Sequence, residues 1–80
     1  MNAAALREFL RQQPFVPFEL VLTSGDRFRV MHPEMMLLMN NRVIVARPPA
    51  RGSGLPDQYV TLSYLHIAAA TPLEGTEKAK

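Results

Sequence analysis

Hydrophobic and polar residues alternate along residues 18–30, on both sides of a Ser-Gly-Asp sequence. Alternation with a period of two is typical of strands that bury one face, and a short glycine-containing segment between two such runs is typical of a hairpin. A three-residue loop of residues 24–26 keeps the apolar side chains together on one face, with Gly25 as the expected site of positive φ. The expected cross-strand pairs are Leu22 with Phe28, Leu20 with Val30, Val21 with Arg29 and Thr23 with Arg27.

The N-terminal segment has a helical pattern instead. Its apolar positions i, i+3 and i+4 are Leu6, Phe9 and Leu10. Asn2 is a suitable N-cap and Pro14 disfavours helical geometry in the residue before it, so the pattern predicts a helix over residues 2–13. A helix this short is marginal on its own, so its apolar stripe must pack on the sheet or on another subunit.

The run of residues 35–39 is apolar throughout, after Pro33 has interrupted the ladder of the hairpin. Asn40-Asn41 tolerates left-handed backbone and predicts a second tight hairpin into a strand over residues 42–46. A strand without alternation implies that both of its faces are covered. Either the helix covers the second face or a neighbouring molecule does, and the sequence leaves both open. The candidate interface residues of a homo-oligomer are Met35, Met36, Leu37 and Met39.

The second half of the chain continues the β pattern. Residues 47–57 contain prolines, glycines and arginines and predict a surface loop, and residues 58–63 alternate again with Val60 and Leu62 inward. A turn over residues 64–66 precedes residues 67–71, which suit either a strand or a short helical turn because of their alanines. The prediction is one domain over residues 1–73, a mainly β five-stranded antiparallel barrel with an N-terminal helix, followed by a disordered tail over residues 74–80.

Two groups of known proteins resemble this chain. One is a group of small uncharacterised bacterial proteins, common in planctomycetes, with a Pro-Phe-x-Pro-Phe opening, a strand pair across a glycine and a His-Pro-Glu step. The matching segments here are Leu6–Leu10, Pro14–Phe18, Leu22–Asp26, Val30–Glu34 and Leu62–Ile67. This resemblance covers most of the chain and implies no activity.

The second resemblance is to the Sm-like proteins, and among them to the Hfq family. The order of helix, bent strand pair, apolar strand, variable loop and two last strands is similar, and residues 64–66 resemble the Tyr-Lys-His segment of Hfq. Sm-like proteins form rings that bind RNA, and their last two strands pair between neighbours. The resemblance therefore implies a small Sm-like or SH3-like barrel, with Tyr64 and His66 as candidate RNA contacts.

Composition limits the chemistry. The chain has 80 residues, a net charge of +2 and no cysteine, which excludes disulfides, thiolate metal sites and cysteine nucleophiles. His32, Glu34 and His66 are the one histidine and carboxylate combination that could meet, but their spacing matches no ligand pattern. No nucleophile-elbow or phosphate-loop motif is present. We therefore expect neither catalysis nor a metal or cofactor. With no apolar run long enough for a membrane span and no secretory signal, we expect a cytoplasmic protein.

Seven of the nine basic residues are arginine, which suits planar contacts with phosphate or carboxylate. Cationic positions beside tyrosines can follow a single nucleic-acid strand by phosphate contact and base stacking. The candidate RNA or DNA contacts are Arg27, Arg29, Arg42, Arg47, Arg51, Tyr64 and His66. The alternatives are that these charges only solvate the surface, with Glu19 diagonally near Arg29, or that the protein is an interaction or assembly module that uses its Met/Leu strand.

Overall fold

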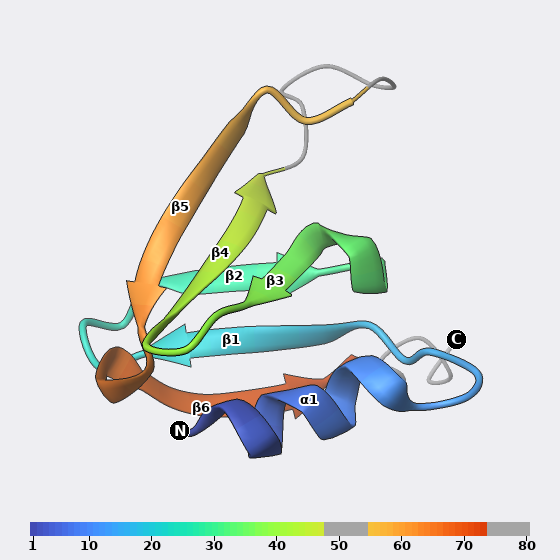
Figure 1. Ribbon diagram of the computed structural model, residues 1–80, viewed down its shortest axis with the longest axis horizontal. Helices are drawn as coiled ribbons and strands as arrows, with labels where there is room; N and C mark the ends of the chain where they lie inside the picture. Colours follow the sequence, from blue (N-terminus) through green and yellow to red (C-terminus); the bar gives the residue numbers. More distant parts are fainter. Residues whose placement is uncertain (48–54, 74–80) are drawn as a thin grey trace.

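The structure is a computed structural model that describes residues 1–47 and 55–73 (Figure 1). It is mainly β, with one N-terminal helix and two three-stranded antiparallel sheets. The elements are α1 (Ala3–Arg11), β1 (Phe18–Leu22), β2 (Arg27–Val30), the 3-10 turn η1 (Pro33–Met35), β3 (Met36–Leu38), β4 (Arg42–Arg47), β5 (Gln58–Ser63), the 3-10 turn η2 (Tyr64–His66) and β6 (Ile67–Pro72). The strand order is β2-β1-β6 in one sheet and β3-β4-β5 in the other.

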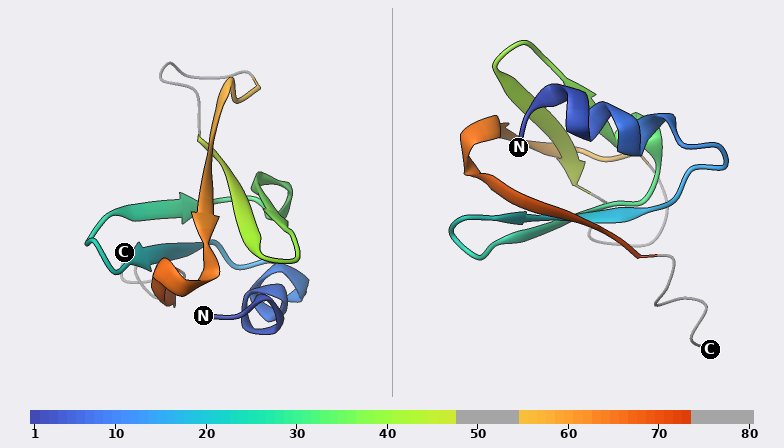
Figure 2. Two further views of the ribbon diagram at one scale, coloured as in Figure 1. Left: turned by 60° about the vertical axis from the view of Figure 1, so that its left-hand side comes forward. Right: turned by 90° about the horizontal axis from the view of Figure 1, so that it is seen from below.

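The N-terminal helix is confirmed, although α1 is shorter than the predicted range. The Oδ1 atom of Asn2 accepts a hydrogen bond from the backbone N–H of Ala5 at 2.8 Å, which caps the first turn. Leu6 is fully buried, and the ring of Phe9 lies 4.9 Å from that of Phe18 in β1. Because α1 also contacts β3, it packs against both sheets (Figure 2).

The first hairpin has the predicted loop length but a different register. Leu20 pairs with Phe28 and Phe18 with Val30, two residues away from the expected pairing. The loop is Thr23-Ser24-Gly25, because the N–H of Leu22 donates to the carbonyl of Asp26 at 2.9 Å, and the predicted loop of residues 24–26 is wrong by one residue. Gly25 has a φ of 97°, as expected, and this left-handed residue after a tight turn fixes the register. The other observed pairs are Glu19 with Arg29 and Val21 with Arg27.

The bend after the hairpin and the second hairpin are confirmed. Pro33 begins η1, which separates β2 from β3 because proline donates no ladder hydrogen bond. The described residues contain six strands, one more than the predicted five-stranded barrel. Asn40-Asn41 forms a two-residue loop, since the N–H of Met39 donates to the carbonyl of Arg42 at 2.9 Å. Neither asparagine has a positive φ. The turn was predicted because asparagine tolerates left-handed backbone, but this turn does not use that geometry.

The last segments also follow the predicted order. Residues 64–66 form η2, and the alanine-rich segment is strand β6, which pairs with β1. The expected loop over residues 47–57 and the expected tail over residues 74–80 fall largely outside the described residues. Among the described strands, the pairing forms two separate sheets, so the five-stranded closed barrel is not seen. The buried core between the sheets and α1 consists of Leu6, Phe18, Leu20, Val30, Met36, Val43, Val45, Leu62 and Ile67.

Candidate functional site

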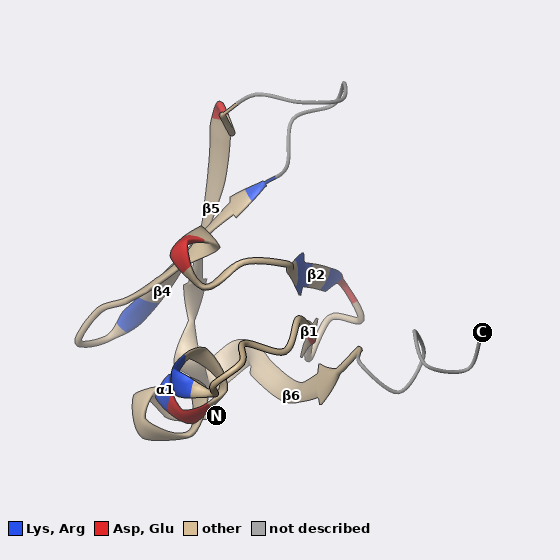
Figure 3. Ribbon diagram, turned by 90° about the vertical axis from the view of Figure 1, so that its right-hand side faces the viewer, with Lys and Arg blue, Asp and Glu red and all other residues tan. Residues whose placement is uncertain are grey.

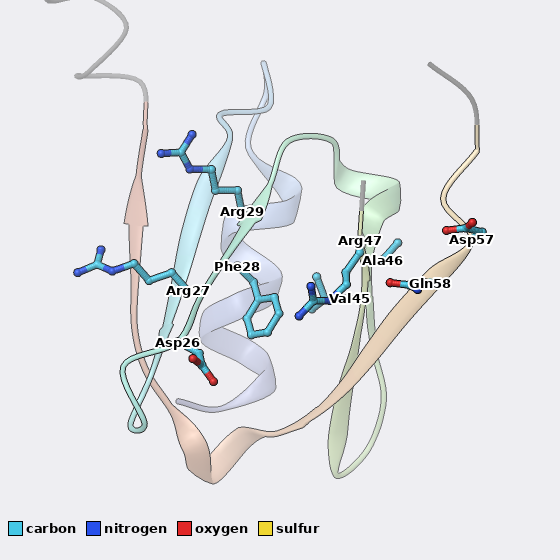
Figure 4. Close-up of a pocket in the computed structure, with 9 residues that line it drawn as sticks. All are labelled: Asp26, Arg27, Phe28, Arg29, Val45, Ala46, Arg47, Asp57 and Gln58. Atoms are coloured by element: carbon cyan, nitrogen blue, oxygen red, sulfur yellow. The ribbon is translucent and has the colours of Figure 1, made fainter. Parts of the chain in front are cut away.

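Three of the candidate arginines surround one groove, between β2 and the ends of β4 and β5. We call it the arginine groove, and it has a volume of about 620 Å³. Alternation along β2 directs its side chains to opposite sides, so Arg27 and Arg29 point away from Phe28, which faces Arg47 across the gap (Figure 4). The lining residues are Asp26, Arg27, Phe28, Arg29, Val45, Ala46, Arg47, Asp57 and Gln58.

On the outer face of the β2-β1-β6 sheet, the carboxylate of Glu19 holds two arginines. The Nη1 atom of Arg27 lies 3.0 Å from Oε1, and the Nε atom of Arg29 lies 3.6 Å from Oε2. Glu19 retains 15% of its side-chain exposure, whereas Arg27 retains 63% and Arg29 retains 66%. The pairing predicted as diagonal between Glu19 and Arg29 is therefore direct, because the register places them opposite one another. One carboxylate shared by two exposed arginines leaves this face with a net positive charge.

Inside the groove, an aromatic ring supports the third arginine. The guanidinium carbon of Arg47 lies 5.2 Å from the centre of the Phe28 ring, within the range of a cation–π contact. Asp26 and Asp57 lie on the same groove, so carboxylates balance its arginines once Glu19 is included. Ser24 and Asp26 are joined by a 3.3 Å hydrogen bond between their side chains, which orders the turn beside the groove. The groove is a mixed-charge site rather than a purely basic one.

The remaining candidate nucleic-acid contacts lie elsewhere. Arg42 is at the opposite end of β4 from Arg47, and its Nε donates to the side-chain oxygen of Asn41 at 3.2 Å. The hydroxyl of Tyr64 donates to the carbonyl of Met39 at 2.6 Å. Figure 3 shows basic segments on α1, on β2 and at both ends of β4 rather than along one face. The structure thus brings together three of the seven candidates, and Arg51 lies outside the described residues.

A second cavity, of about 440 Å³, lies between the first hairpin turn and β5. His66 lines it together with hydroxyl side chains, including those of Ser24 and Thr61. His32 and Glu34 lie at η1, whereas His66 belongs to η2, about thirty residues further along the chain. Within residues 1–47 and 55–73, no three histidine or carboxylate side chains are close enough together to hold a metal ion.

The Met/Leu strand has one buried and one open face. Met36 is 5% exposed and points into the core, whereas Leu37 is 58% exposed and Met39 is 44% exposed. Met35, in η1, is half-buried against the core. We expected both faces of this strand to be covered, by this chain or by a neighbour. α1 and the core cover the Met36 side, whereas Leu37 and Met39 are open to solvent in a single copy. Coverage of the second face is therefore not seen in a single copy, and an oligomer interface there stays a prediction.

Sequence reasoning missed two features of the site. It treated Phe28 only as a core residue, although its ring also supports Arg47. It gave Asp57 no role, although Asp57 reaches the groove at the start of β5. The alternation placed Phe28 on the apolar face of its hairpin, whereas Arg47 was assigned to the following surface loop. The crossing of the two sheets that brings the two side chains together could not be read from the chain.

Comparison of the chain with protein-family models, with curated proteins and with solved structures finds no match. Of the described residues, no helix is long and apolar enough to cross a membrane.

Proposed function

We propose that this protein is a non-enzymatic interaction domain that self-associates through the outer face of its β3-β4-β5 sheet. The observation that supports this proposal is the exposure of Leu37 in β3 and of Met39 directly after it, although Met36 of the same strand is in the core. Exposed apolar residues that occur singly are ordinary, but a contiguous group on one face is typical of an interaction site.

The apolar group extends across all three strands of this outer face, which also carries Thr61 and Ser63 of β5. Leu37 pairs with Ile44 in β4, and Tyr59 of β5, 68% exposed, pairs with Ala46 in the next row of that face. We call this the apolar surface, and it consists of Leu37, Met39, Ile44, Ala46 and Tyr59. Arg42, beside Met39, is the charged residue of these rows. Self-association would remove this surface from water, at about 25 cal/mol per Å² of apolar area buried.

Molar mass in solution tests this proposal. Size-exclusion chromatography with light scattering should show an oligomer whose mass is unchanged at high salt, since apolar contacts are not screened. The double variant Leu37→Lys/Met39→Lys should be a folded monomer with an unchanged circular dichroism spectrum, because both positions are open to solvent. Met36→Lys should instead unfold the protein, because it buries an unpaired charge.

The matched control adds the same two charges on the other sheet. Ala68 and Thr71 of β6 are exposed, so Ala68→Lys/Thr71→Lys should leave the oligomer intact. A monomeric wild-type protein would contradict the proposal, and so would dissociation by the β6 variant alone, which would locate the interface at that strand edge.

An Sm-like or SH3-like arrangement is part of this proposal, as is membership of the planctomycete-type group that the sequence motifs resemble. The arrangement is supported by β2 and β3 acting as two halves of a strand bent at Pro33, by η2 before the last strand and by the pairing of β6 with β1. A cytoplasmic location also belongs to the proposal.

A second candidate function is the binding of RNA or DNA. The observation that favours it is the Arg47 guanidinium on the Phe28 ring, in a groove whose rim has the exposed arginines Arg27 and Arg29. Cations beside an aromatic ring suit a single strand, and such binding weakens steeply with salt. It ranks second because Glu19, Asp26 and Asp57 offset these arginines.

Fluorescence anisotropy with short single-stranded RNA and DNA tests this candidate. At low salt we expect micromolar binding that Arg47→Gln weakens and physiological salt largely removes. The control Arg7→Gln/Arg11→Gln removes two exposed charges from α1, away from the groove, and should have a smaller effect. A flat titration at low salt would eliminate nucleic-acid binding.

A further inference from the structure

The outer edge of β2 has backbone groups that no described strand uses. β2 is the end strand of its sheet, paired with β1 alone. The N–H of Leu22 donates to the carbonyl of Asp26, which marks one hydrogen-bonded pair of the ladder. Bonded pairs alternate in an antiparallel ladder, so Phe28 and Val30 also direct their backbone groups toward β1. The N–H and C=O groups of Arg27 and Arg29 therefore point away from the sheet.

The arginine groove runs along this edge. Three consecutive residues of β2, from Arg27 to Arg29, line it, with Asp26 directly before them and residues 45–47 of β4 opposite (Figure 4). A surface formed by one face of a strand would be lined by alternate residues, so consecutive lining residues mean that the strand edge itself borders the groove. Its volume of about 620 Å³ is in the range of ligand sites.

The side chains beside this edge differ on its two sides. Phe28 is half-buried and faces Arg47 inside the groove, whereas Arg27 and Arg29 lie on the outer face, largely exposed (Figure 4). Across the outer face, the sheet already has one acidic neighbour for these arginines, Glu19 in β1. A strand added on the free side of β2 would bring its own alternate residues beside the same two arginines.

We propose that the free edge of β2 binds an extended segment of another protein, with acidic residues alternating with apolar ones. The guest adds a fourth strand to the β2-β1-β6 sheet. Its acidic side chains pair with Arg27 and Arg29 on the outer face, and an apolar side chain between them packs on Phe28. This mode of recognition takes affinity from backbone hydrogen bonds and specificity from alternate side chains. The edge of β2 belongs to the other sheet from the apolar surface, with Ala46 the one residue that the groove and that surface share, and the binding does not depend on self-association there.

Two other occupants fit this edge less well. A second copy paired edge to edge would place Arg27 and Arg29 against the same residues of its partner, and like charges directly opposite are destabilising. A nucleic-acid strand supplies phosphate acceptors but no regular donors for the free carbonyls of Arg27 and Arg29. Asp26 and Asp57 would also repel phosphates along the groove.

The probe is a labelled peptide with the sequence Thr-Glu-Val-Glu-Val-Glu-Thr, capped at both ends and measured by fluorescence anisotropy at low salt. It should bind, and replacing the central glutamate by proline should weaken binding about tenfold more than replacing it by glutamine does. A glutamate opposite an arginine directs its N–H at β2 in an antiparallel pair, and proline removes that donor as well as the charge. Arg27→Gln/Arg29→Gln should lose a similar factor. Arg7→Gln/Arg11→Gln, with the same net charge, should not.

Backbone amides give a second readout that charge alone does not change. In hydrogen exchange followed by nuclear magnetic resonance, the amides of Arg27 and Arg29 should exchange fast in the free protein and become protected with the peptide bound. The proposal is overturned if the unsubstituted peptide fails to bind at millimolar concentration, if the proline peptide binds as well as the glutamine peptide, or if the two amides stay unprotected. Displacement of the peptide by a short oligonucleotide that binds more tightly would assign the groove to nucleic acid instead.

Discussion

The two sheets have similar inner faces and contrasting outer faces. Inward, both present fully buried residues, such as Leu20 in β1 and Val43 in β4. Outward, the β2-β1-β6 sheet presents the ion pairs of Glu19, while the β3-β4-β5 sheet presents Leu37 and its apolar neighbours. Side chains point alternately inward and outward in the strands of both sheets, and the two sheets differ in the residues of their outer faces.

The contrast separates stability from recognition. Charges on an exposed face can be satisfied by one another and by water, so the outer face of the β2-β1-β6 sheet is stable in a single copy. Exposure of apolar side chains such as Leu37 to water is unfavourable, and a partner that covers them removes this cost. We therefore expect large effects on folding from inner residues of either sheet, and small effects from outer residues of both.

The largest expected effect is that of Phe18→Ala. Phe18 is fully buried, with Phe9 and Phe15 against its ring, so its removal leaves a cavity between α1 and β1. The free energy of unfolding should fall by about 3–5 kcal/mol, measured by urea denaturation. Val43→Ala, in the other sheet, should also destabilise the protein, but less, because it removes fewer atoms. If Val43→Ala had no effect, the two inner faces would not share one core.

How far the sequence predicts this fold is clearest in the first hairpin. Alternation assigned every side chain of β1 and β2 to the correct face, although the predicted pairing was two residues away from the observed one. A shift of two residues preserves the faces, so burial cannot distinguish the two registers. What decides is the turn, where Gly25 takes the left-handed position at the end of the loop rather than at its centre.

The candidate site was less predictable than the fold. The sequence identified Arg27, Arg29 and Arg47 as candidates, but it could not show that Glu19 holds the first two or that Phe28 supports the third. Those contacts depend on register and on the way the two sheets cross. Pro33 was read correctly as a break. The break separates β2 from β3, and the two strands belong to different sheets. β2 is therefore an end strand, and its free edge lies beside the groove.

Gly25→Ala tests the turn that sets the register of the charged face. A Cβ atom at position 25 would meet no atom within 4 Å, so the cost comes from the backbone alone. With φ at 97°, an L side chain is strained there, and we expect a loss of about 1–2 kcal/mol in thermal or urea unfolding. Gly25→Asn should lose less, because asparagine tolerates left-handed geometry. Equal stability of all three proteins would mean that the turn adopts another conformation.

Glu19→Gln should have a smaller effect, because its partners Arg27 and Arg29 are mostly exposed. We expect a loss of about 1 kcal/mol or less at low salt. In about 1 M NaCl, where the screening length falls to about 3 Å, the difference from the wild type should shrink. A loss that is independent of salt would mean that Glu19 acts through packing rather than charge, and the two outer faces would then differ less than we infer.

The smallest expected effect on folding is that of Leu37→Thr, on the opposite outer face. Leu37 is 58% exposed and threonine suits a strand, so the unfolding free energy of the monomer should change by no more than about 0.5 kcal/mol. Measured at increasing protein concentration, however, the wild type should gain stability from self-association and the variant should gain less, since binding stabilises the folded state by mass action. If the unfolding free energies of the two proteins rose equally with protein concentration, Leu37 would have no partner. The outer face of the β3-β4-β5 sheet would then not be an interaction surface.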